Sequence, residues 1–99
     1  MKSNAIKSGP ARAPARAMLR ATGMDDAAIA KPFVGVIHTW TDVSPCNLNL
    51  RELARHVREG VQSAGGTAVE FNTIAVTDGI AMGTDGMRAS LASRETIAD

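Results

Sequence analysis

The most constraining feature of the sequence is a long amphipathic segment that lies between two short apolar ones. Apolar residues recur along residues 50–64 at spacings of three and four, which is the period of one helix face. Residues 33–37 and 67–76 are rich in β-branched and aromatic side chains, as strands are. The pattern predicts a β-α-β unit with parallel strands and a right-handed crossover. The predicted fold class is therefore α/β.

The predicted long helix begins at Ser44-Pro45. Serine is a good N-cap, proline is favoured at the first helical position, and Gly65-Gly66 would close the helix. Cys46 then lies in the first turn, where unpaired N–H groups and the helix dipole favour a thiolate. A thiolate is a nucleophile and a soft metal ligand. A small buried core cysteine is the alternative.

The first predicted strand, residues 33–37, is a continuous apolar run, which is typical of a strand buried on both faces. Gly35 inside it predicts the close approach of another backbone. His38 ends this strand on the same side of the sheet as the Cys46 loop, so it is a better candidate base than His56, which lies in mid-helix. A structural histidine with satisfied hydrogen bonds is the alternative for His38.

The chain changes character after the second predicted strand. Residues 77–87 hold three glycines and two acidic residues, so they are expected to form a loop. Asp78 follows the buried strand directly, and ligands bind beyond the carboxyl ends of parallel strands. Its carboxylate is of the kind that Mg²⁺ takes, although an Asx-turn within the loop is the alternative. Ser93, with Glu95 two residues later, could begin a short terminal helix.

The N-terminal region is basic, because five Lys and Arg residues precede Asp25, the first acidic residue. We expect residues 1–11 to form a flexible basic arm, although an organelle-targeting peptide has the same composition. Residues 12–22 are good helix formers, and Gly23 would stop that helix. Its three arginines share one face, which would be solvated or contact an anionic partner. Residues 24–32 are expected to form a polar connection.

Composition excludes several classes of protein. The formal net charge is +1, and aromatic residues make up 3% of the chain, so neither charge nor base stacking favours nucleic-acid binding. No apolar run approaches the ~18 residues that a membrane-spanning helix needs. One cysteine rules out an internal disulfide framework and a complete Cys-Cys zinc site.

Three separated blocks of the sequence resemble one known family. They are ARAMLRATGM at 15–24, TWTDVSPCN at 39–47 and VEFNTIAVTDGIAMGTDGMR at 69–88, the last followed by Ser93-Arg94-Glu95. These blocks are similar, in the same order, to the dihydroxy-acid/sugar-acid/phosphogluconate dehydratases, and most of all to the dihydroxy-acid branch. The chain departs from the family at His38, where asparagine is common, and at Ala92, where proline is common.

The resemblance implies an enzyme that dehydrates 2,3-dihydroxy-3-methyl carboxylates to 2-oxo acids, in the biosynthesis of valine and isoleucine. It implies two cofactors, an iron–sulfur cluster (2Fe–2S or 4Fe–4S) and Mg²⁺. By position, Cys46 matches the first cluster cysteine and Asp78 matches the first Mg²⁺ ligand. No catalytic residue of the family falls within this chain, since the remaining ligands and a serine base lie beyond position 99.

We therefore expect residues 12–99 to be the truncated N-terminal part of a dehydratase α/β domain, inactive by itself. The expected partner is a small dihydroxy-acid substrate, with no nucleic acid and no membrane. The full-length enzyme is expected to be a cytoplasmic homodimer. Two alternatives stay open: a sugar-acid dehydratase of the same family, and a stand-alone, non-catalytic binding domain.

Overall fold

A computed structural model describes all residues from Met1 to Asp99. The two strands are β1 (Phe33–His38) and β2 (Thr67–Asn72). The α-helices are α1 (Asn4–Lys7), α2 (Ala13–Ala21), α3 (Asp26–Ala30), α4 (Leu50–Ser63), α5 (Asp78–Ala81) and α6 (Ser90–Ala98). Two short 3₁₀ helices complete the chain, η1 (Pro10–Arg12) and η2 (Asp85–Ala89).

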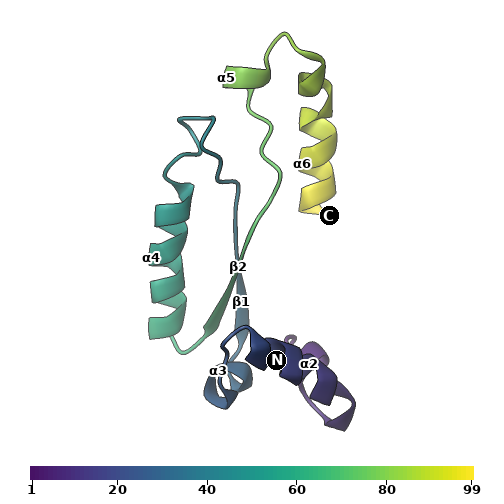
Figure 1. Cartoon of the computed structure of the whole chain (residues 1–99), viewed down its shortest axis with the longest axis vertical. Coiled ribbons are helices and arrows are strands. Elements are labelled where there is room, and N and C mark those ends of the chain that lie inside the picture. Colours follow the sequence, from purple (N-terminus) through teal and green to yellow (C-terminus); the bar gives the residue numbers. More distant parts are fainter. The chain divides into compact units, whose positions relative to one another are not determined.

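The two strands form one parallel sheet, and α4 is the connection between them (Figure 1). The Thr67 N–H donates to the Pro32 carbonyl at 2.8 Å, and the Thr73 N–H donates to the His38 carbonyl at 2.9 Å. Residue numbers increase by the same amount along both strands between these two bonds, so the strands run in the same direction. The structure thus confirms the predicted α/β class and the β-α-β unit.

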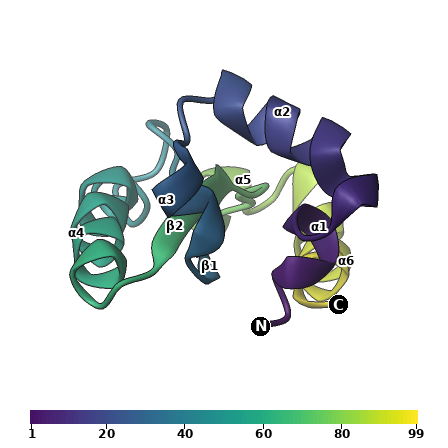
Figure 2. The ribbon, with the colours of Figure 1, turned by 90° about the horizontal axis from the view of Figure 1, so that it is seen from below.

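The chain divides into two compact units, which are described separately. The first comprises Met1–Val36 and Val57–Val69, and the second comprises Ile37–His56 and Glu70–Asp99. In the first unit α2 contacts α1, η1 and α3. Figure 2 labels the three α-helices. The predicted helix at 12–22 is confirmed as α2, and Gly23 after it has a φ of 93°, a left-handed value that favours glycine.

The basic N-terminal residues are held by the first unit. Residues 1–11, expected as a flexible arm, carry α1 and the start of η1 in the structure. The Lys7 side chain is buried, with its ammonium donating to the Lys31 carbonyl and lying 4.3 Å from the centre of the Phe33 ring. Arg16 donates to the carbonyls of Lys7 and Gly9 at 3.0 and 2.8 Å. Arg16 therefore closes the N-terminal turn, whereas Arg12 and Arg20 on the same predicted face are exposed.

One short helix was not expected. The polar connection predicted at 24–32 contains α3, which begins after Asp25. The Asp25 carboxylate accepts a hydrogen bond from the Ala28 N–H at 2.7 Å, as an N-cap does. A helix of five residues is too short to show the apolar period by which a sequence pattern indicates a helix.

Few apolar side chains are buried. They are Ile29, Val36 and Ala68 in the first unit and Ala54 in the second. The prediction that residues 33–37 are buried on both faces is wrong, since Val34 is 40% exposed and Ile37 is 59% exposed. A two-stranded sheet has too few neighbours to cover both faces of a strand.

The expected close approach at a strand glycine occurs elsewhere. A Cβ on Gly35 would meet nothing within 4 Å, so that prediction is wrong. At buried Gly66, a Cβ would lie 2.9 Å from Cγ1 of Val61 and 3.4 Å from Cγ2 of Val34. The tight position is therefore the one between α4 and β2, where the helix turns back onto the sheet.

The C-terminal part of the second unit is helical. Residues 77–87, predicted as a loop, contain α5 and the start of η2, and α6 begins at Ser90 rather than at Ser93. The 3₁₀ turn η2 contacts both α5 and α6. Gly83 follows α5 with a φ of 81°, so one of the glycines that suggested a loop makes the turn between helices. No helix has the length and apolar character that crossing a bilayer requires.

Candidate functional site

Cys46 lies in the connection between β1 and α4, ahead of the helix. The predicted helix start at Ser44-Pro45 is wrong, because α4 begins at Leu50. Two tight turns precede it, in which the Asn47 N–H donates to the Ser44 carbonyl at 3.1 Å and the Leu50 N–H donates to the Asn47 carbonyl at 3.2 Å. Cys46 is thus outside the first turn of the helix, and the dipole argument for its thiolate does not apply.

A hydrogen bond joins the Cys46 loop to the chain that follows β2. The Ser44 hydroxyl donates to the Thr77 hydroxyl at 3.4 Å, and Ser44 is 1% exposed. Cys46 lies two residues after Ser44, and Asp78 directly follows Thr77. The segments that carry the two predicted ligands therefore meet beyond the carboxyl ends of the strands, where parallel sheets bind ligands.

Both predicted ligand side chains are accessible. Cys46 is a free, exposed cysteine, so the alternative of a buried core cysteine is wrong. Asp78 is the first residue of α5 and is exposed, with no side-chain hydrogen bond or ion pair. Asp78 therefore does not form the Asx-turn that was the alternative prediction. The two side chains fit a soft and a hard metal ligand, but no group of three His, Cys, Asp or Glu residues is placed to hold an ion.

His38 is occupied by structural hydrogen bonds. Its Nδ1 accepts from the Trp40 N–H at 3.3 Å, and its Nε2 lies 3.0 Å from Oε1 of Glu70. Since Nδ1 accepts, the ring proton lies on Nε2 and is donated to the carboxylate. The His38 side chain is 10% exposed. Of the two predicted roles, the structural histidine is confirmed, and the role of a base beside Cys46 is not supported.

His56 is exposed on α4, as predicted, with Nε2 3.5 Å from Oε1 of Glu52. Glu52 also accepts hydrogen bonds from Arg55, and these bonds hold the pKa of the Glu52 carboxyl below its ordinary value. This cluster lies on the solvated face of the helix and contacts neither predicted ligand. We assign it to helix stabilisation.

Asn72 clamps the start of the Cys46 loop, a role that the sequence did not reveal. Its Oδ1 accepts from the Trp40 N–H at 2.7 Å, and its Nδ2 donates to the Trp40 carbonyl at 3.1 Å. The Arg51 guanidinium lies 3.6 Å from the centre of the Trp40 ring, a cation–π contact. The only sequence signal was that Asn72 is a polar interruption where the second strand was expected to continue.

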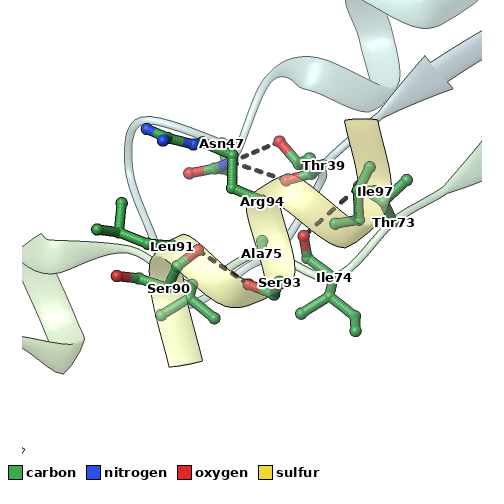
Figure 3. A pocket seen from close by; sticks show the side chains of 11 residues that line it. Thr39, Asn47, Thr73, Ile74, Ala75, Ser90, Leu91, Ser93, Arg94 and Ile97 are labelled. Carbon is green, nitrogen blue, oxygen red and sulfur yellow. Dashed lines mark hydrogen bonds between the residues drawn. The ribbon is translucent and has the colours of Figure 1, made fainter. Parts of the chain in front are cut away.

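Asn47 closes the other end of the loop. Its Nδ2 donates to the carbonyl and to the hydroxyl of Thr39, at 2.8 and 3.0 Å (Figure 3). These bonds join residues at the two sides of the turn that carries Cys46. The loop is thereby fixed by polar side chains, because it has no strand or helix ladder of its own.

A pocket of about 320 Å³ lies between α6 and the chain after β2 (Figure 3). Its polar lining comes from Thr39, Asn47, Thr73, Ser90, Ser93 and Arg94. Neither Cys46 nor Asp78 lines it. The Arg94 guanidinium is 2.6 Å from the Glu95 carboxylate, and the Ser93 hydroxyl donates to the Ser90 carbonyl at 3.1 Å. Arg94 and Ser93 are therefore bonded within α6, while Asn47 is bonded to Thr39, which also lines the pocket.

Comparison with known proteins gives a consistent result. The profile of the family described as dihydroxy-acid/6-phosphogluconate dehydratase N-terminal matches residues 31–99. The chain is 58% identical over 98 residues to the dihydroxy-acid dehydratase of Koribacter versatilis. It is 58% identical over 99 residues to that of Thermus thermophilus, and 54% identical over 99 residues to that of Methanothermobacter thermautotrophicus.

These matches cover nearly all of the chain but little of each relative. They span 99% of the chain and 17% of the Koribacter protein, and 100% of the chain and 18% of the Thermus and Methanothermobacter proteins. The chain therefore spans less than a fifth of the length of these curated relatives.

Proposed function

Because the chain belongs to the dihydroxy-acid/6-phosphogluconate dehydratase family, we propose that it forms the N-terminal part of a dihydroxy-acid dehydratase. Such an enzyme removes water from a 2,3-dihydroxy carboxylate to give a 2-oxo acid, which serves valine and isoleucine biosynthesis. The observation that carries the proposal is the 58% identity to the Thermus dihydroxy-acid dehydratase over the whole chain.

The proposal assigns one ligand to each of two cofactors. Cys46 supplies a thiolate to an iron–sulfur cluster, and Asp78 supplies a carboxylate to Mg²⁺. In support, both side chains are exposed, and the segments that carry them are joined by the Ser44–Thr77 hydrogen bond. A cluster needs three or four protein ligands, and Mg²⁺ needs further oxygen ligands. The remaining ligands would come from regions that correspond to the unmatched part of the relatives.

The chemistry at such a site is charge stabilisation. Cys46 and Asp78, together with ligands from elsewhere in the enzyme, would hold the two cofactors, which would supply Lewis acidity that stabilises negative charge on the substrate. The residues of this chain hold the ligands in place: Ser44 and Thr77 join the two segments, and Asn72 fixes the start of the Cys46 loop. We assign no proton transfer to this chain, since both ring nitrogens of His38 are already bonded.

The rest of the proposal concerns the whole enzyme. We propose a cytoplasmic homodimer that acts on a small dihydroxy acid and binds neither nucleic acid nor a membrane. The isolated chain of 99 residues should be inactive, because its one thiol and one placed carboxylate complete neither metal site. A sugar-acid substrate is the second candidate, since the matching family also includes 6-phosphogluconate dehydratases.

The proposal can be tested with a chimera in which this chain replaces the matching 99 residues of the Thermus enzyme. We expect the chimera to bind a cluster, seen by visible absorption, and to convert 2,3-dihydroxy-3-methylbutanoate to the 2-oxo acid. Cys46→Ser should abolish both. Asp78→Asn should abolish the activity and leave the cluster. Asp85→Asn is the matched control, since Asp85 is exposed and has a single ion pair, with Arg88.

The outcomes are decisive for both ligands. A Cys46→Ser chimera that keeps its cluster would show that residue 46 is not a ligand. An Asp78→Asn chimera with the Mg²⁺ affinity and activity of the parent chimera would remove the magnesium assignment. Sequencing the reading frame beyond codon 99, followed by assays of that product on dihydroxy acids and sugar acids, separates the two substrate classes and the stand-alone binding domain.

A further inference from the structure

We propose that Asn47 is a positioning residue, whose side-chain amide closes the loop between β1 and α4 and so fixes the place of Cys46. This inference rests on the proposed function, in which Cys46 is a cluster ligand. It assigns to Asn47 no contact with substrate or cofactor. Its action is exerted through the backbone that carries the thiol.

Asn47 connects three points of the loop. Its Nδ2 donates to the Thr39 carbonyl and hydroxyl at 2.8 and 3.0 Å, so it reaches back to the residue after β1. Its N–H donates to the Ser44 carbonyl at 3.1 Å, and its own carbonyl accepts from Leu50, the first residue of α4, at 3.2 Å. One residue therefore ties the start, the middle and the end of the connection together.

The residues on both sides of Cys46 are fixed. Ser44 is 1% exposed and bonded to Thr77, and Asn47 is held by the bonds described above. Pro45 lies between them, and its ring restricts φ. Between these fixed residues, the Cys46 thiol is exposed and has no bonding partner. It is the side chain within residues 44–47 that can bind a metal. The loop thus presents one thiol from a rigid turn.

A rigid turn matters for a ligand because metal affinity depends on groups that orient the ligand without touching the metal. Loss of such groups typically lowers metal affinity or activity by about 10- to 100-fold. A ligand on a loop needs this support more than a ligand on a helix or a strand does. A residue that only stabilises the loop would instead lower the melting temperature and leave cluster retention unchanged.

Two isosteric variants separate these roles. Asn47→Asp keeps the size of the side chain and removes both N–H bonds to Thr39. Asn49→Asp adds the same charge two residues later, at an exposed asparagine whose side chain makes no hydrogen bond. Thr39→Val removes one of the two acceptors, and Thr39→Ser restores it.

The experiment uses the Thermus chimera after cluster reconstitution. The half-time for loss of the visible cluster absorption is measured in the presence of an iron chelator, and the melting temperature is measured by circular dichroism. We expect the half-time to fall about tenfold in Asn47→Asp and to change less than about twofold in Asn49→Asp. The half-time of Thr39→Val should lie between those of the two asparagine variants, and Thr39→Ser should recover the half-time of the parent chimera. Asn47→Asp should also lower the melting temperature, because it removes two part-buried hydrogen bonds, but both asparagine variants should be fully folded at the temperature of the chelator assay.

Two results would overturn the inference. One is an Asn47→Asp chimera that retains its cluster as long as the parent does. The other is a shortened half-time that is matched by an equal loss of folded structure. Failure of the proposed function would be seen in a different variant, since a Cys46→Ser chimera would then retain its cluster. If Cys46→Ser removes the cluster while Asn47→Asp leaves its lifetime unchanged, the positioning role alone is refuted.

Discussion

The bonds between Asn72 and Trp40 predict a measurable loss of stability in Asn72→Ala. The substitution removes the nearer of the two acceptors of the Trp40 N–H, at 2.7 Å, and leaves His38 Nδ1 at 3.3 Å. It also removes the donor to the Trp40 carbonyl, at 3.1 Å. Each bond contributes about 0.5–1.5 kcal/mol net. Because Asn72 is exposed and water replaces part of the loss, we expect the free energy of unfolding of the chain to fall by about 1–2 kcal/mol.

The assay is urea denaturation of the chain and its variants, followed by circular dichroism, with the midpoint and slope fitted separately. Asn49→Ala is the control, since it removes an exposed asparagine without a side-chain hydrogen bond. Asn72→Asp keeps the acceptor of the Trp40 N–H and should recover part of the loss. A change below about 0.3 kcal/mol in Asn72→Ala, with an unchanged slope, would refute the clamp.

Two further predictions concern packing and charge. Gly66→Ala should destabilise the chain by about 1–3 kcal/mol in urea denaturation, because the new Cβ would lie 2.9 Å from Cγ1 of Val61. Gly35→Ala, where a Cβ meets nothing within 4 Å, should be neutral or stabilising, and equal losses at both glycines would contradict the packing argument. Arg55→Gln should raise the pKa of Glu52 toward its ordinary value of 4.5, as measured by NMR titration, since hydrogen bonding by Arg55 is the main cause of the lowered pKa. A carboxyl with a lowered pKa stabilises the folded state above its ordinary pKa, so this contribution to stability should disappear as the pH falls through the lowered value. An unchanged pKa of Glu52 in Arg55→Gln would disprove the pairing.

The parts of the fold that the sequence predicted are those set by local patterns. The apolar period of residues 50–64 marks α4, and the β-branched segments mark β1 and β2. Gly23 stops α2 because only its backbone adopts a φ of 93° without strain. The α/β class follows from the order of these elements, and no long-range contact is needed to infer it.

The errors lie where long-range contacts decide the local structure. Ser44-Pro45 has the composition of a helix start, yet α4 begins at Leu50 while Asn47 bonds to Thr39. A bond to a residue eight positions earlier leaves no periodic signal. The glycines of residues 77–87 suggested a loop, whereas α5 needs only four residues and its stop at Gly83. The helix α5 has no buried residue and is a single turn closed by local backbone bonds, such as Ala81 N–H to the Thr77 carbonyl at 2.8 Å.

The candidate site was predicted only in part. Asp78 could be singled out because it directly follows a predicted strand. Cys46 was singled out by its predicted place in the first turn of the helix, which is wrong. The surroundings of both residues resemble one family. Their ligand roles stay predictions. Asn47 and Asn72 could not be found, since an asparagine that clamps a loop has the same local sequence as one in solvent. The bonding partners, which lie 8 and 32 residues away, define the roles of these two residues.

The exposure of the apolar side chains bears on where the clamp should matter most. In the second unit Ala54 is the one buried apolar residue, while Ile74 and Leu91 are 66% and 62% exposed. In the proposed enzyme, further chain would cover such surface and exclude water from neighbouring polar groups. An unmade hydrogen bond costs more free energy when its groups are buried. Asn72→Ala should therefore destabilise the Thermus chimera more than it destabilises the chain of 99 residues, and an equal loss in both would mean that the Trp40 clamp stays in contact with solvent in the whole enzyme.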